Sequence, residues 1–218
     1  MKLSDEQLKK DKERFISILA EACEARQIQG DHWQALIDKL ENSNWFTSPA
    51  STRYHASYEG GLVRHSLNVY DNLMDLVRMK GLEESIRPDS IAIVALLHDF
   101  SKMNLYEPGV RNVKKYYPEG SKFDAMGHFD WVAEPTFNMV EDSKRFIYGN
   151  HEETSEFMIR QYIPLSYIES CAIINHHGGM GFDSVQGKSP MDAMTRYPLV
   201  ALLHMADMLA CTIDESEV

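Results

Sequence analysis

The chain has 218 residues, of which 44% are hydrophobic and 25% charged, and its formal net charge is −11. This composition is that of a globular protein with enough chain to bury a core in one large domain or two small ones. The acidic charge argues against duplex nucleic acid as a partner, whereas a small anionic substrate is compatible if a metal supplies local positive charge.

The sequence carries no signal for a membrane segment. It has no run of 18 apolar residues, and its first 15 residues are charged where a signal peptide needs an apolar stretch. The cysteines Cys23, Cys171 and Cys211 are odd in number and lie in apolar stretches, which is typical of reduced thiols. We therefore expect a soluble cytoplasmic protein with no membrane partner.

The hydrophobic pattern predicts helices over most of the chain. Apolar residues recur at helical spacing over residues 4–27, 31–41 and 62–80, and a Pro-Asp-Ser start signal at 88–90 opens another helix. Residues 42–61 are rich in Ser, Thr, Asn, Gly and Pro and are predicted to form a long ordered loop. Further helices are expected at 152–162, 164–177 and 198–212, with a loop at 181–190.

Residues 103–149 differ from their surroundings because proline and glycine interrupt short runs such as VKKYY and FDWV. This pattern predicts a small insertion of one or two β-hairpins. The predicted fold class is therefore all-α, a helical bundle with a small β-hairpin insertion at about 103–149. The helices of residues 1–45 are expected to pack on a core domain of residues 46–218.

Several apolar helices end or begin with polar residues. The run IAIVALL leads into His98, Asp99 and then Lys102. The dipeptide alone is weak evidence, because a histidine and an aspartate at a helix end commonly satisfy each other. Four other segments also place such residues on or at the end of a predicted helix: His65, His151, the pair His176 and His177, and Asp207. Buried polar groups in five segments favour a shared site, and imidazole with carboxylate suits divalent transition metals or Mg²⁺.

The order His65, His98-Asp99 and Asp207 resembles the HD superfamily of metal-dependent phosphohydrolases, and HDFSK is similar to that family's HD-x-x-K. His151 with His176 and His177 resembles the family's two-metal branch, which includes cyclic-dinucleotide phosphodiesterases. The segment FTSPASTRYHASYEGGLVRHSLNV is similar to the HD domain of 3′-5′ exoribonucleases and to small phage and bacterial HD proteins. The resemblance covers residues 46–211.

The resemblance implies a ligand set and a cofactor. His65, His98, Asp99 and Asp207 would hold the first metal, and Asp99 would bridge to a second metal held by His151 and His176, with His177 as a further candidate. The cofactor would be one or two divalent ions of Mn, Fe, Ni, Co, Zn or Mg. Gly61 stands where the cyclic-dinucleotide branch often has a glutamate, which argues against that substrate.

The implied mechanism uses a hydroxide held between two metals about 3.5–4 Å apart as the nucleophile. Asp99, Lys102, His55 and His128 are the candidate catalytic residues: Lys102 would bind a phosphate oxygen, and His55 or His128 would protonate the leaving group or contact substrate. In the insertion, candidate substrate-binding residues are Arg111, Lys114, Lys115 and Tyr116, with Tyr117 beside them. The alternative for this segment is a solvated hairpin with its two tyrosines folded inward.

The predicted function is hydrolysis of a phosphoester in a nucleoside mono- or triphosphate or a short oligonucleotide. Alternatives are a cyclic-nucleotide or cyclic-dinucleotide phosphodiesterase, a non-catalytic nucleotide-binding HD module, a purely structural bundle, and oxygenase chemistry at a di-iron site. The expected partner is a small phosphorylated substrate, with a homo-oligomer possible through the amphipathic N-terminal helix.

Overall fold

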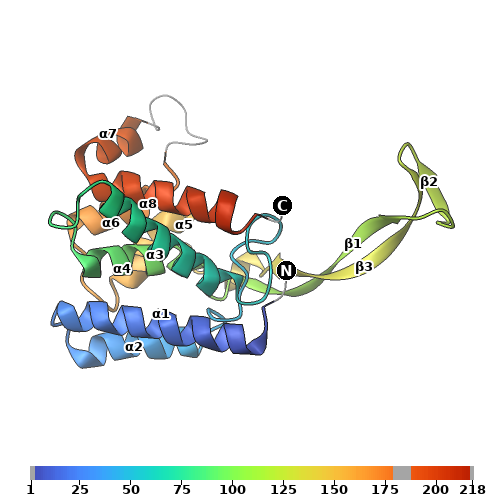
Figure 1. The fold of residues 1–218 in the computed structure, drawn as a ribbon. Helices are drawn as coiled ribbons and strands as arrows, with labels where there is room; N and C mark the ends of the chain where they lie inside the picture. Colours follow the sequence, from blue (N-terminus) through green and yellow to red (C-terminus); the bar gives the residue numbers. More distant parts are fainter. Residues whose placement is uncertain (1–2, 179–187, 217–218) are drawn as a thin grey trace.

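The computed structural model describes residues 3–178 and 188–216 (Figure 1). Its elements are α1 (Asp5–Ala25), α2 (Gly30–Glu41), α3 (Gly61–Met79), α4 (Pro88–Leu97), η1 (Phe100–Lys102), β1 (Tyr106–Tyr116), β2 (Lys122–Asp124), β3 (Gly127–Met139), η2 (Asp142–Lys144), α5 (His151–Ile159), α6 (Tyr167–Ile174), α7 (Lys188–Arg196), α8 (Pro198–Leu209) and η3 (Ala210–Asp214). The prediction of a loop at 181–190 falls partly on 181–187, outside the described residues, and is wrong for 188–190, which open α7.

The all-α prediction is wrong, because the insertion forms a three-stranded antiparallel sheet with the order β1-β3-β2. Strands β1 and β3 are 11 and 13 residues long and pair from Tyr106 with Met139 to Tyr116 with Phe129. The sequence pattern predicts that Pro108 and Pro135 separate short runs, yet both lie inside these strands. β1 lies at one edge of the sheet. β2 pairs with β3 only as far as Phe129, so at Pro135 strand β3 has no neighbour on that side. The N–H group that each proline lacks therefore removes no hydrogen bond between the strands. The fold is therefore mixed α and β.

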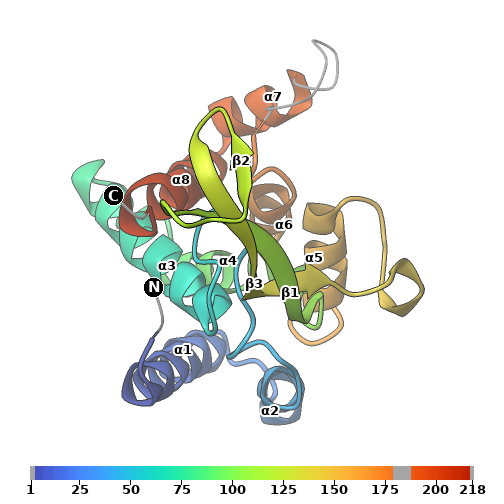
Figure 2. The same cartoon turned by 90° about the vertical axis from the view of Figure 1, so that its right-hand side faces the viewer.

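The sheet projects from the helical body as a long arm (Figures 1 and 2). Its few buried contacts centre on Phe129, whose ring lies 5.6 Å from that of Tyr116 and 5.9 Å from that of Trp131. Tyr116 and Tyr117 each remain 40% exposed, so neither tyrosine is folded fully inward.

Helix α4 lies at the centre of the body, packed against α1, α3, α6 and α8. Its residues 93–97 are completely buried, as expected for a helix that is apolar on all sides. The N-terminal helices contact the same core through a row of aromatic side chains. The ring centroid of Trp45 lies 5.8 Å from the ring centroids of both Phe15 and Phe100. This packing fixes the chain that follows α4.

No single described helix is both long and apolar enough to cross a membrane. Among the described residues, one bent pair of helices, Pro190–Arg196 and Pro198–Asp214, has the length and composition when its halves are combined, and the chain bends by 113° between them.

A buried ion cluster joins α1, α4 and α6. The Arg26 guanidinium donates to the carboxylates of Asp89 and Glu169, whose side chains are 6% and 2% exposed, and to Ser90 Oγ at 3.1 Å. Burial raises the pKa of Glu169, but hydrogen bonds from Arg26 and Ser90 outweigh it, so the pKa lies below its usual value. The pKa of Asp89 is lowered in the same way, by hydrogen bonds from Arg87 and Arg26 that outweigh burial. The folded state therefore favours both ionised carboxylates.

Replacing Arg26 with methionine should lower the free energy of unfolding by about 3–5 kcal/mol at pH 7, because two buried carboxylates lose their cation. Urea titration measures the change. The matched control is Arg14→Met, which removes a half-exposed pair with Asp71 and should cost under about 1 kcal/mol.

The same cluster makes stability pH-dependent. A carboxyl whose pKa is lowered in the folded state stabilises the protein above its unfolded pKa of about 4, and this stabilisation is lost as the pH falls through the folded value. Wild type should therefore lose stability below about pH 4 more steeply than Arg26→Met. Equal slopes of unfolding free energy against pH would contradict this assignment.

Candidate metal centre

The structure brings the predicted metal-ligand residues into one cluster inside the helical body. His65 comes from α3, His98 and Asp99 follow α4, His151 begins α5, His176 and His177 follow α6, and Asp207 lies on α8. Most are inaccessible, with His65, His98, Asp99, His176 and Asp207 between 0% and 5% exposed. The side chains of His151 and His177 are 33% and 46% exposed and form the open side of the cluster.

Helix ends position several of these residues. His98 is the C-cap of α4, and His176 lies two residues beyond the end of α6. Helix C-termini carry partial negative charge and orphan carbonyl groups, so a cation is favoured where they converge.

Asp99 lies between two groups of histidines. Its Oδ2 atom is 3.4 Å from His98 Nε2 and 3.7 Å from His65 Nε2. Its Oδ1 atom is 3.7 Å from His151 Nε2 and 3.9 Å from His176 Nε2. Each carboxylate oxygen thus faces a different pair of imidazoles, as a bridge between two cations would.

The ligand atoms form compact groups on the two sides of Asp99. One group is His65, His98 and Asp207, and another is His151, His176 and His177, with the atoms of each group within 4.8 Å of one another. Within the first group, His65 Nε2 is 3.2 Å from His98 Nε2 and 3.3 Å from Asp207 Oδ1.

The histidines are oriented by hydrogen bonds on the opposite side of each ring. His98 Nδ1 donates to Ala95 O at 2.9 Å and His176 Nδ1 donates to Ile173 O at 2.7 Å, which leaves each Nε2 with a lone pair. Carboxylates take this role for the others: His65 Nδ1 is 3.1 Å from Glu215, His151 Nδ1 is 3.1 Å from Glu152, and His177 Nδ1 is 2.8 Å from Glu152. Such outer partners are typical of metal-binding histidines.

Three atoms at the centre lack hydrogen-bond partners within the described part of the chain: Asp99 Oδ1, His151 Nε2 and His176 Nε2. Buried polar atoms are rarely left unsatisfied, because each costs its desolvation energy. These three atoms face one another beyond hydrogen-bond distance. A cation between them would satisfy all three, so the donor set fits a divalent metal.

The charges inside the cluster are shifted by burial and by neighbours. Burial lowers the pKa of His176 to about 3, which keeps this imidazole neutral at pH 7. Burial also acts on His65, but hydrogen bonds to Asp207 and Glu215 outweigh it and raise its pKa to about 10. Burial would raise the pKa of Asp99, yet the nearby Lys102 ammonium group lowers it well below its usual value. At pH 7 the site therefore combines an ionised Asp99 carboxylate with a neutral His176 imidazole, whereas His65 is protonated and would have to release a proton to bind a metal.

Lys102 is drawn into this cluster. Its Nζ atom lies 2.7 Å from Asp99 Oδ2, and its side chain is 13% exposed. The sequence places this lysine where it would bind a phosphate oxygen, whereas here its ammonium group pairs with the central carboxylate.

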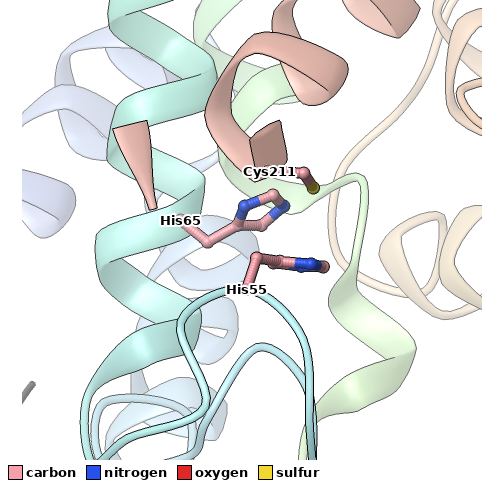
Figure 3. A group of neighbouring side chains, drawn as sticks. All are labelled: His55, His65 and Cys211. Carbon is pink, nitrogen blue, oxygen red and sulfur yellow. The ribbon is translucent and has the colours of Figure 1, made fainter. Parts of the chain in front are cut away.

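His55 lies beside His65, with their ring centroids 5.0 Å apart (Figure 3). Its loop is held by bonds from Ala50 N to Ala56 O and from Ser51 Oγ to His55 O. Glycine is required at Gly61, because a Cβ atom there would lie 1.9 Å from Ala56 O. The long loop thus carries His55 to the rim of the cluster.

The insertion residues are not brought to the cluster. His128 lies in β3 near its turn with β2, and these strands form the distal end of the arm (Figure 1). Its Nδ1 atom donates to Gly120 O at 3.0 Å, within the arm itself. Arg111, Lys114, Lys115 and Tyr116 lie on β1, where Lys114 and Tyr116 bind Asp124 and Lys115 pairs with Glu134. Strands rise about 3.3 Å per residue, so the length of the arm carries these side chains away from the helical body.

Sequence reasoning missed three residues beside the metal ligands: Glu152, Glu215 and Cys211. Glu152 follows His151 directly, and its single carboxylate serves both His151 and His177. Glu215 lies in the acidic segment DESEV, where only the fold shows that this side chain is buried while Asp214 is exposed. Cys211 lies one helical turn after Asp207 and donates to Asp207 Oδ1 at 3.4 Å.

Comparison of the chain with protein-family models, curated proteins and solved structures finds no match.

Glu215→Gln should weaken the affinity for Mn²⁺ by about 10–100-fold, because the amide keeps the shape but no longer orients His65 through a charged acceptor. Calorimetric titration of metal-free protein measures the change. The neighbouring Asp214→Asn variant is the control and should bind as wild type does. Equal affinities for Glu215→Gln and Asp214→Asn would contradict the role of Glu215.

Proposed function

We propose that the chain is a metal-dependent phosphohydrolase of the HD type that acts on a nucleotide. The observation that carries the proposal is the carboxylate of Asp99, which lies between two groups of histidines and has one oxygen without a hydrogen-bond partner among the described residues. Two groups of ligands about one carboxylate are the donor arrangement of a two-metal centre for phosphoryl chemistry.

The residues divide into two proposed ligand sets joined by Asp99. His65, His98 and Asp207 would hold one ion, and His151 and His176, with His177 at the open side, would hold the other. When bound, divalent ions of Mn, Fe, Co, Ni, Zn or Mg supply Lewis-acid polarisation of the phosphoryl group and an acidified water.

The chain's own residues orient and balance this centre. Lys102 holds Asp99 Oδ2 and neutralises part of the carboxylate charge. Glu215 and Glu152 hold the Nδ1 atoms of His65, His151 and His177, so the Nε2 atoms stay directed inward. Since His151 and His177 are the most exposed of the ligands, substrate is proposed to approach from their side.

A cavity of about 430 Å³ next to η1 is proposed to hold the base of a nucleotide, although none of the proposed metal ligands lines its wall. Ser101, two residues after Asp99, lies in its wall together with Phe157 and Tyr162, and Lys144 and Arg145 add positive charge. Aromatic and cationic side chains are the groups that bind a base and its phosphates.

We further propose a cytoplasmic location, in keeping with three cysteines that form no disulfide.

Purified protein loaded with Mn²⁺ should hydrolyse at least one compound in a panel of nucleoside mono-, di- and triphosphates, cyclic nucleotides and short oligonucleotides. Asp99→Asn should reduce the rate at least about 10³-fold, because the variant loses the carboxylate shared by both ligand sets. Phosphate or nucleoside release, followed by chromatography, measures the rate.

The matched control is His32→Ala, which removes an exposed histidine of α2 and should leave the rate unchanged. Absence of hydrolysis across the panel with Mn²⁺, Co²⁺, Ni²⁺, Mg²⁺ and Zn²⁺ would refute the proposed activity.

A further inference from the structure

One group of possible metal ligands lies at the edge of the proposed centre and differs in chemistry from the groups around Asp99. It consists of His55, His65 and Cys211, whose ligand atoms lie within 4.8 Å of one another (Figure 3). The three residues come from the loop after α2, from α3 and from the π-helical turn η3. No other group among the described residues includes a thiol.

His55 supplies a nitrogen that nothing in the described protein satisfies. Its Nε2 atom is buried and has no hydrogen-bond partner there. The bonds that hold the loop use the backbone of His55 and Ala56, so they leave the imidazole uncommitted. A buried nitrogen without a partner next to another imidazole and a thiol fits a metal ligand.

Cys211 adjoins the first ligand set without belonging to it. Its Sγ atom donates to Asp207 Oδ1 at 3.4 Å, and the same oxygen lies 3.3 Å from His65 Nε2. His65 is common to both groups, whereas His98 and Asp207 belong only to the first. One imidazole is therefore shared between a set with a carboxylate and a set with a thiol.

We propose that His55, His65 and Cys211 form a separate position for a soft divalent ion such as Zn²⁺, and that an ion there withdraws His65 from the catalytic centre. A thiolate favours Zn²⁺ over Mn²⁺ and Mg²⁺, which carboxylate and imidazole accept. Binding replaces the S–H bond of Cys211 with a sulfur–metal bond, and the proton passes to solvent. The position would make zinc an inhibitor of the enzyme loaded with a harder ion.

Co²⁺ tests the position directly, because a cobalt–thiolate bond gives a charge-transfer absorption that nitrogen and oxygen ligands do not. The metal-free full chain should show this band on titration with Co²⁺, and Zn²⁺ should abolish it by displacement. Cys211→Ser should lack the band, and Cys171→Ser, which removes another half-buried thiol, should retain it. Absence of the band in wild type, or its persistence in Cys211→Ser, would overturn the proposal.

Two further variants define the site. His55→Gln should weaken Zn²⁺ binding by at least about tenfold, measured by competition with a chelating dye. Asp99→Asn should keep the cobalt–thiolate band, because Asp99 is not one of the three ligands. Unchanged zinc affinity in His55→Gln, or loss of the band in Asp99→Asn, would show that Cys211 does not act in a separate position.

The inhibitory role rests on the proposed phosphohydrolase activity, and hydrolysis with Mn²⁺ tests it. Added Zn²⁺ should lower the rate of hydrolysis with Mn²⁺ at least about tenfold in wild type and in Cys171→Ser, but not in Cys211→Ser. An equal effect of Zn²⁺ on the rate in all three proteins would overturn the inhibition. A cobalt–thiolate band without any hydrolysis would refute the proposed function and leave the metal position standing, whereas hydrolysis without a band would do the reverse.

Discussion

The interaction on which this structure depends is the burial of one carboxylate, Asp99, among imidazoles. Its side chain is 2% exposed, and Lys102 is the only lysine or arginine within ion-pair distance among the described residues. Lys102 holds one carboxylate oxygen, while the other faces His151 and His176 without a hydrogen bond. A buried ion with one unsatisfied oxygen is expensive, so its retention at the centre of the helical body points to a cation as the missing partner.

The packing of the helical body and the local ion pair with Lys102 together position this carboxylate. Helix α4 is buried on all sides, and the aromatic contacts of Trp45 with Phe15 and Phe100 fix the segment that follows it. The outer carboxylates of Glu152 and Glu215 then turn three imidazoles inward. Because the proposed ligands and their outer carboxylates lie in helices or within three residues of a helix end, the proposed metal site is positioned without an ion.

The fold could be predicted from the sequence where apolar residues recur at helical spacing. Apolar spacing located most helices of the body to within a few residues but missed α7 (Lys188–Arg196). The start of α5 at His151 agrees with the expected position of that histidine at a helix start. The length of the arm could not be predicted, because Pro108 and Pro135 look like strand breakers until their edge positions are known. The buried state of Glu215 was equally hidden, since a hydrogen bond to His65 spans 150 residues of sequence.

Anomalous diffraction from crystals grown with Mn²⁺ tests the central claim most directly. The account predicts two anomalous peaks, one on each side of the Asp99 carboxylate, with ligand atoms about 2.0–2.3 Å from each peak. One peak should adjoin His65, His98 and Asp207, and the other should adjoin His151 and His176. No peak at Asp99, or metal bound only elsewhere on the chain, would contradict it.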